Sequence, residues 1–224
     1  MELSPTTLKT QARFALRETY GEAVAVILIR VCIIIPMAVM AAVLLMRGAS
    51  RPDVVYFSIL IGSELLLLAL LTGALAVGAA RYFLETAELR GPEVTVMFQS
   101  FRDYRSTVEM FLLRTVLTLL WSLLLVVPGV IAGLRYAMAP YIMAVRPGVR
   151  AADALRLSSQ MMRGRKRAYC RLLLSFFGWY LLGLATAGIG FFFIAPYVET
   201  AKAGFFNTCA EQQGLALGVE IEPA

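Results

Sequence analysis

The sequence predicts an all-α integral membrane protein, a polytopic bundle of about six transmembrane helices. The first observation is composition, because 59% of the 224 residues are hydrophobic and only 16% are charged, unlike soluble domains. The second is that the apolar residues form long segments, and the third is that basic residues gather between those segments. Together they indicate a single integral membrane domain over residues 1–224.

The residues before Gly21 predict a short, mildly amphipathic basic helix that begins at Ser4-Pro5. This region has neither an early apolar core nor a cleavage site, so we expect no removable signal peptide. We therefore expect the first spanning helix to serve for targeting.

Six apolar segments follow, and each of the first two exceeds the roughly 20 residues that cross a bilayer core of about 30 Å. The segments run from about Gly21 to Met46, Val54 to Ala80, Thr107 to Val127, Val130 to Val145, Tyr169 to Ala187, and Gly190 to Phe206. The fourth segment is short, and only the first half of the sixth is strongly apolar. Two arrangements are therefore open, in which these two segments either span the membrane or re-enter it from one side.

Prolines and glycines mark the expected interruptions of these helices. One tight turn is expected after the third segment and another after the fifth. The candidate helix breaks are Pro128, Gly129, Pro140, Gly188, Gly190 and Pro196. Interrupted helices can point to a transporter's binding site, but prolines and glycines are also common in membrane helices without that role.

The distribution of basic residues predicts the orientation. With the chain starting inside, sixteen Lys and Arg residues fall in the cytoplasmic pieces, whereas Arg47 and Arg51 alone fall in the outer loops. This bias follows the positive-inside rule. We expect both termini in the cytoplasm.

A repeat of roughly 57 residues is also indicated. Each copy has a basic and aromatic entry, then an apolar helix with Trp121 or Trp179, a glycine-containing turn, and an Ala-Pro-Tyr sequence that ends at Tyr141 or Tyr197. The units cover about 101–146 and 163–206, with a linker at about 147–164 and a tail at 207–224. Chance similarity between common membrane residues is the alternative.

The linker predicts an amphipathic helix that lies in the inner membrane interface. Val149, Ala152, Leu155 and Met162 fall near one face of this helix, and Gly164 stands where a C-terminal cap is expected. We expect short interfacial helices of this kind beside the spanning bundle.

From about Gly91 to Phe206 the chain resembles a family of bacterial integral membrane proteins known as domain of unknown function nine-seven-five. The runs LLLVVPGVIAGLRYAMAPYI, ALRLSSQMMRGRK and LSFFGWYLLGLATAGIGFFFIAPYVETAKAGFF carry the resemblance, and the start LKTQARFALRETYGEA is also similar. The resemblance implies a multi-span helical protein of the bacterial cytoplasmic membrane and supplies no activity. Where the family is expected to have a histidine, this chain has Arg165-Lys166-Arg167, so no histidine role is carried over.

The sequence offers no positive case for catalysis. It has no histidine, which excludes histidine-based triads and metal sites, and it lacks GxSxG, P-loop, paired CxxC and aspartate-rich metal motifs. The three cysteines have no metal-ligand spacing. We expect no enzyme activity, no metal and no cofactor.

Ionisable residues inside the apolar segments form a candidate intramembrane polar site. Glu64 lies about ten residues into the second segment, near mid-membrane, where a charge costs a few kcal/mol unless it is protonated, paired or hydrated. Its candidate partners are Arg30, Arg114 and Arg135. Either these residues bind an anionic or proton-coupled solute, or a Glu–Arg pair between helices fixes their packing.

Two further features concern the cytoplasmic side. Glu199 and Lys202 are one helical turn apart and are predicted to pair at the inner end of the last helix. A basic cluster is the candidate contact for anionic lipid headgroups, at about 1 kcal/mol for each basic residue near an anionic leaflet. Its members are Arg163, Arg165, Lys166, Arg167 and Arg171.

These features predict a non-enzymatic membrane scaffold, or a lipid- or partner-binding component in envelope or lipid homeostasis. A small transporter or permease component that uses the Glu64 region is the alternative. Nucleic-acid binding is not expected, because no soluble aromatic-rich surface accompanies the charge. Homo-oligomerisation is left open.

Overall fold

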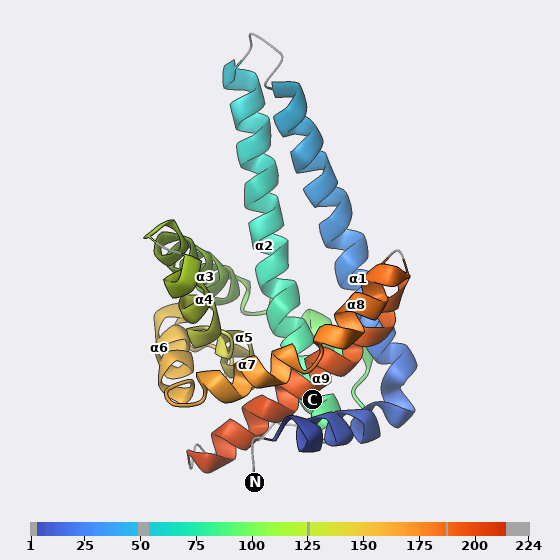
Figure 1. The fold of residues 1–224 in the computed structure, drawn as a ribbon. Coiled ribbons are helices and arrows are strands. Elements are labelled where there is room, and N and C mark those ends of the chain that lie inside the picture. The colour runs from blue at the N-terminus through green and yellow to red at the C-terminus, as the bar shows by residue number, and fades with distance from the viewer. Residues whose placement is uncertain (1–3, 49–53, 125, 187, 214–224) are drawn as a thin grey trace.

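A long helical hairpin stands on a layer of shorter helices in the computed structural model, which describes residues 4–48, 54–124, 126–186 and 188–213 (Figure 1). The hairpin consists of α1 (Pro5–Gly48) and α2 (Val54–Ala87). The layer contains η1 (Val94–Phe101), α3 (Tyr104–Leu124), α4 (Val126–Arg135), α5 (Ala139–Val145), α6 (Ala151–Met161), α7 (Lys166–Leu174), α8 (Phe177–Ala185) and α9 (Ile189–Gln212). The described residues are thus all-α.

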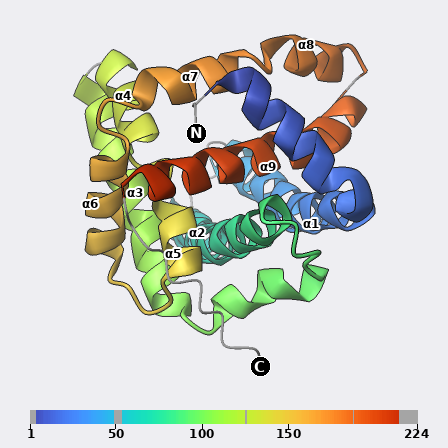
Figure 2. The same cartoon turned by 90° about the horizontal axis from the view of Figure 1, so that it is seen from below.

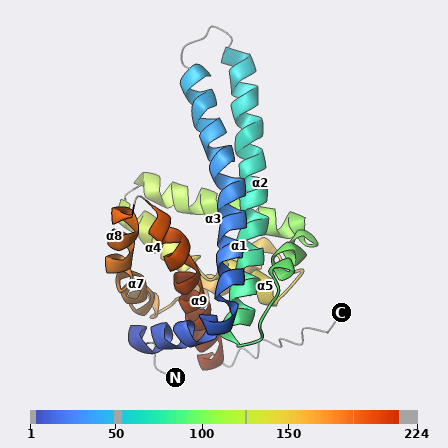
Figure 3. The same cartoon turned by 90° about the vertical axis from the view of Figure 1, so that its right-hand side faces the viewer.

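The layer helices run across the hairpin rather than along it. Seen from below, α9 crosses the middle of the molecule, α7 and α8 lie along one side, and α3 follows another (Figure 2). From the side, α3 again crosses α1 and α2, at the upper edge of the layer (Figure 3). The first turns of α1 also lie in this layer before the helix rises into the hairpin.

The buried core lies at the base, where the first half of α1, the end of α2 and α9 pack together. Its largest fully buried side chains include Tyr82, Phe83, Phe176, Phe205 and Phe206. Outside this core, apolar side chains are exposed on both hairpin helices and on α3 and α8 of the layer, including Ile35, Val39, Met40, Ile59, Leu66, Leu119, Leu123, Leu182 and Leu184. Exposed apolar surface on this scale indicates contact with lipid.

Four helical stretches of the described chain are long and apolar enough to cross a membrane. They are Pro5–Leu44, Ser58–Ala87, Tyr104–Leu123 and Lys166–Ala185. This finding supports a membrane protein. By length and composition four of the six predicted segments could span, but α3, α7 and α8 run across the hairpin, and the fifth segment divides into α7 and α8. The fourth predicted segment instead divides into the short helices α4 and α5, and the sixth becomes α9, which carries Glu199 and Lys202 in its middle.

Ser158 of α6 holds the break between α4 and α5. Its hydroxyl donates to the carbonyl of Arg135 at 2.8 Å and accepts from the N–H of Met138 at 3.2 Å, and the residue is fully buried. The break would otherwise leave two backbone groups without partners in an apolar interior. The linker helix is thus a packing element, pressed against α3 and α5.

The buried face of α6 differs in part from the predicted one. Leu155 and Met162 are buried as predicted and Val149 is half-buried, but Ala152 is exposed. Ala151, Ala154, Ser158 and Met161 complete the buried face. The difference arises because α6 packs against other helices of the protein and does not lie against lipid headgroups on that face. Ser158 can be buried there because it has two backbone partners.

A residue in the first turns of α1 stabilises a second break, which lies between α7 and α8. The Lys9 ammonium donates to the carbonyl of Ser175 at 2.6 Å and lies 4.4 Å from the centroid of the Phe176 ring. A lysine at the end of a helix satisfies a carbonyl and also interacts with the helix dipole. The basic N-terminal segment therefore anchors the layer as well as carrying charge.

The predicted helix breaks occupy several kinds of position. Pro140 stands in the first turn of α5, and Gly188 precedes α9 with a φ of 91°, a left-handed conformation that favours glycine. Pro128 and Gly129 lie in the first turn of α4, after residue 125, which is outside the described residues. Gly190 and Pro196 lie inside α9, which continues through both.

The Ser158→Ala variant should unfold more easily, because it leaves the Arg135 carbonyl and the Met138 N–H buried without partners. We expect a loss of about 1–3 kcal/mol in the free energy of unfolding, measured as a lower melting temperature in detergent. Ser159→Ala is the matched control, because the Ser159 hydroxyl makes no hydrogen bond in the described chain. Equal melting temperatures for the two variants would contradict this account.

Candidate functional site

Polar side chains from several helices meet at the centre of the layer. On α9, the Lys202 ammonium donates to Glu199 Oε1 at 3.1 Å, and from α5 the Tyr141 hydroxyl donates to Glu199 Oε2 at 3.3 Å. The side chains of Glu199 and Lys202 remain 25% and 23% exposed. These three residues with Arg30, Arg114 and Tyr169 are called the central cluster.

The Glu199–Lys202 pair stays charged over the physiological range. Burial alone would raise the pKa of Glu199, but the Lys202 ammonium, the Arg30 guanidinium and two hydrogen bonds outweigh it and lower this pKa. Burial likewise opposes the charge of Lys202, but Glu199 reverses the effect and raises the pKa of Lys202. Burial and the Glu199 charge raise the pKa of Tyr141 well above its ordinary value, so its hydroxyl remains a donor.

Two arginines from the membrane helices complete the central cluster. Arg30 of α1 interacts electrostatically with Glu199 and Tyr141, and Arg114 of α3 does so with Tyr141 and Tyr169. Neither guanidinium makes a hydrogen bond or an ion pair within the described chain, and Arg30 Nε is buried without a partner. The cluster therefore holds more positive than negative charge.

The structure brings two of the four residues of the predicted intramembrane site together, but around Glu199 instead of Glu64. Glu64 is half-buried on α2, and no ion pair or hydrogen bond joins it to Arg30, Arg114 or Arg135 in the described residues. Arg135 ends α4, where its carbonyl bonds to Ser158.

The role of Glu199 goes beyond the pair at a helix end that the spacing predicts. The Glu199 carboxylate accepts hydrogen bonds from Lys202 of α9 and Tyr141 of α5, and it interacts electrostatically with Arg30 of α1. Its position within the last apolar segment is the signal that could have pointed to this role, since a charge among apolar residues needs partners from other elements. The identity of those partners depends on tertiary packing, which the local pattern does not contain.

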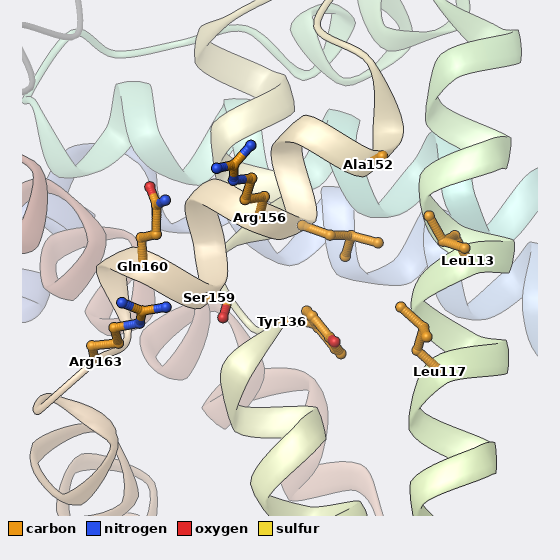
Figure 4. Close-up of a pocket in the computed structure, with 9 residues that line it drawn as sticks. Leu113, Leu117, Tyr136, Ala152, Arg156, Ser159, Gln160 and Arg163 are labelled. Carbon is orange, nitrogen blue, oxygen red and sulfur yellow. The ribbon is translucent and has the colours of Figure 1, made fainter.

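A pocket of about 380 Å³ opens between α3 and α6 (Figure 4). Arg156, Ser159, Gln160 and Arg163 form its polar side, and Leu113, Leu117, Tyr136, Ala152 and Leu155 line the remainder. Figure 4 shows Arg156, Gln160 and Arg163 on one side and the two α3 leucines on the other. This arrangement, called the α3–α6 pocket, matches an amphiphile with an anionic head and an apolar tail.

Two other surface pockets, each of about 530 Å³, also have pairs of arginines. One lies where α1, α8 and α9 meet and is lined by Arg13, Leu16, Arg17, Tyr20, Trp179, Phe193 and Tyr197. There the Arg13 guanidinium lies 5.5 Å from the centroid of the Tyr197 ring. The other is lined by Arg167, Cys170 and Arg171 on α7. Each of these three pockets is therefore lined by two arginines.

The predicted basic cluster divides into residues with different surroundings. Arg163 lines the α3–α6 pocket, and Arg167 and Arg171 line the pocket on α7. Arg165 is engaged within the protein, because its Nη1 donates to the carbonyls of Cys209 at 3.3 Å and Met161 at 3.4 Å. Lys166 is half-buried at the start of α7.

Replacing Glu199 with Gln should destabilise the protein, because Lys202 then loses its carboxylate partner in a largely buried site. We expect a cost of about 1–3 kcal/mol near neutral pH, measured by thermal unfolding in detergent. The lowered pKa of Glu199 stabilises the fold above the carboxyl's ordinary pKa, and this contribution is lost as pH falls through the folded-state value.

The acid-dependent loss should therefore be smaller in Glu199→Gln than in the wild type. Glu211→Gln, at an exposed position on the same helix, serves as the control and should keep the wild-type pH profile. Identical profiles for all three proteins would show that Glu199 does not contribute in this way.

Residues 93–213 match the sequence family described as protein of unknown function (DUF975). Comparison with curated proteins and with solved structures finds no match. The matched range is more than half of the chain and contains η1 and α3 to α9, including Arg114, Tyr141, Glu199 and Lys202 of the central cluster. The chain therefore belongs to the DUF975 family.

Proposed function

We propose that this protein is a non-enzymatic membrane component that binds anionic lipid on its cytoplasmic face, in envelope or lipid homeostasis. The observation that carries the proposal is the α3–α6 pocket, which has two arginines on one side and two leucines on the other. A phospholipid has the matching chemistry, since its phosphate accepts from guanidinium groups and its acyl chains favour apolar side chains.

The topology proposed with this function places α1 and α2 across the membrane and both termini in the cytoplasm. The start of α1 and the end of α9 lie at the same end of the molecule, opposite the far end of the hairpin (Figure 1). The lengths of α4 and α5, and the course of α9 across the base, favour the re-entrant arrangement over six full spans. The arginine-lined pockets then face the inner headgroups, where basic residues are favoured.

The two arginines of the α3–α6 pocket have no carboxylate partner in the described chain and can therefore bind an anionic headgroup. Arg156 and Arg163 are exposed and make no ion pair in the described chain, whereas Arg150, at the N-cap of α6, pairs with Asp153 at 2.9 Å. Leu113 and Leu117 lie one turn apart on α3, whose outer face continues into exposed leucines. An acyl chain that follows this face remains in apolar surroundings as it leaves the headgroup.

A small transporter or permease component is the second candidate function. It is favoured by the central cluster, where ionisable groups from α1, α3 and α9 meet beside the hairpin. This function requires solute flux in proteoliposomes that changes when a cluster residue is replaced.

The double variant Arg156→Gln/Arg163→Gln should retain less phosphatidylglycerol than the wild type. At about 1 kcal/mol for each lost charge near an anionic lipid, affinity should fall by about tenfold to thirtyfold. Native mass spectrometry of the protein in detergent, with phosphatidylglycerol titrated against phosphatidylcholine, measures the change.

Arg102→Gln/Arg150→Gln is the matched control, because it removes the same charge from exposed positions outside the pocket. It should retain lipid as the wild type does. If both double variants lose the lipid equally, net charge explains the effect and the pocket proposal is wrong.

A further inference from the structure

The central cluster contains an imbalance of charge that the protein itself does not neutralise. Lys202 neutralises Glu199 through the 3.1 Å ion pair. Arg30 and Arg114 then remain, and neither has a carboxylate partner in the described residues. The other groups that act on the cluster are the tyrosines Tyr141, Tyr169 and Tyr180, which are uncharged at neutral pH.

The two arginines are held in surroundings where an unpaired charge is costly. Arg30 lies within the apolar stretch of α1, and Arg114 lies within that of α3; both side chains are half-buried. Charged residues in such helices ordinarily face the protein interior and pair there. Both arginines interact electrostatically with Tyr141, Arg30 from α1 and Arg114 from α3.

Hydrogen-bond donors without acceptors surround this position. Arg30 Nε is buried and has no partner. The Arg114 guanidinium and the Tyr169 hydroxyl make no hydrogen bond in the described part of the chain. The Tyr169 ring packs against Phe205, at 5.1 Å between centroids, and Tyr169 interacts electrostatically with Lys202, Glu199 and Arg114.

Glu199 is the acceptor that could have satisfied these donors, but other groups hold it. Lys202 binds one of its oxygens and Tyr141 binds the other. The carboxylate therefore attracts Arg30 electrostatically but forms no hydrogen bond with it in the described residues. The guanidinium N–H groups of Arg30 and Arg114 remain available to another acceptor. This arrangement both lowers the repulsion that Glu199 would exert on an anion and leaves the guanidinium donors available.

We propose that the central cluster is a binding site for an oxyanion, a phosphate or carboxylate group, held by Arg30 and Arg114 with the Tyr169 hydroxyl. The planar guanidinium fork matches the paired oxygens of these groups, and a desolvated position strengthens each charge-assisted bond. The anion arrives either free or as the headgroup of a lipid that enters between the helices. The site shares no residue with the α3–α6 pocket, so either proposal can fail without the other.

The first experiment measures thermal stability of the wild type and of Arg30→Gln and Arg114→Gln in detergent. Sodium phosphate should raise the melting temperature of the wild type more than sodium chloride at equal ionic strength. Each variant should bind phosphate about tenfold or more weakly. Without phosphate, Arg114→Gln should melt at or above the wild-type temperature, because an unpaired charge has been removed, whereas Arg30→Gln also loses its attraction to Glu199.

Arg135→Gln is the matched control. Arg135 is another half-buried arginine of an apolar segment, and it is not part of the central cluster. It should respond to phosphate as the wild type does. Arg30→Lys, which keeps the charge but not the planar fork, should recover only part of the response.

A second measurement identifies the source of the anion. Native mass spectrometry with added phosphatidylglycerol should show a lipid that Arg30→Gln loses and Arg156→Gln/Arg163→Gln keeps if a headgroup occupies the site. A phosphate response without such a lipid assigns the site to a free anion. If neither phosphate nor lipid distinguishes Arg30→Gln and Arg114→Gln from Arg135→Gln, the inference is overturned.

Discussion

Interrupted helices in an apolar environment require that every exposed backbone group find a partner, and the layer of this protein is built around that requirement. Ser158 closes the gap between α4 and α5, and Lys9 closes the gap between α7 and α8. Both donors come from segments distant in the sequence. The short helices therefore gain stability from the linker helix and from the start of α1, which makes the layer cooperative.

A close backbone contact and a side-chain hydrogen bond also join η1 of the layer to α2 of the hairpin. A β-carbon at Gly78 of α2 would collide with the backbone of Met97 in η1, and the Ser100 hydroxyl donates to the carbonyl of Ala74 at 2.8 Å. The hairpin is thus fixed to η1 by a small residue and a buried hydrogen bond.

Much of the fold follows from composition and periodicity, because long apolar segments can only be helices in lipid. The start of α9 after Gly188 and the helical linker follow from local signals of the same kind. The break before Ala139 is signalled locally by Pro140, but the serine that stabilises it is not, since Ser158 is 20 residues away from Met138. Likewise Arg30 and Arg114 are recognisable as unusual residues, whereas their meeting around Glu199 depends on helices that cross at the base.

The contrast between the hairpin and the layer has a consequence for the surrounding bilayer. Two helices make up the far end of the molecule, whereas helices on several sides surround them at the base (Figures 1 and 2). With the hairpin across the membrane, the protein displaces more lipid from the leaflet at its base than from the opposite one. Its insertion therefore changes the balance of area between the two leaflets, independently of any molecule that it binds.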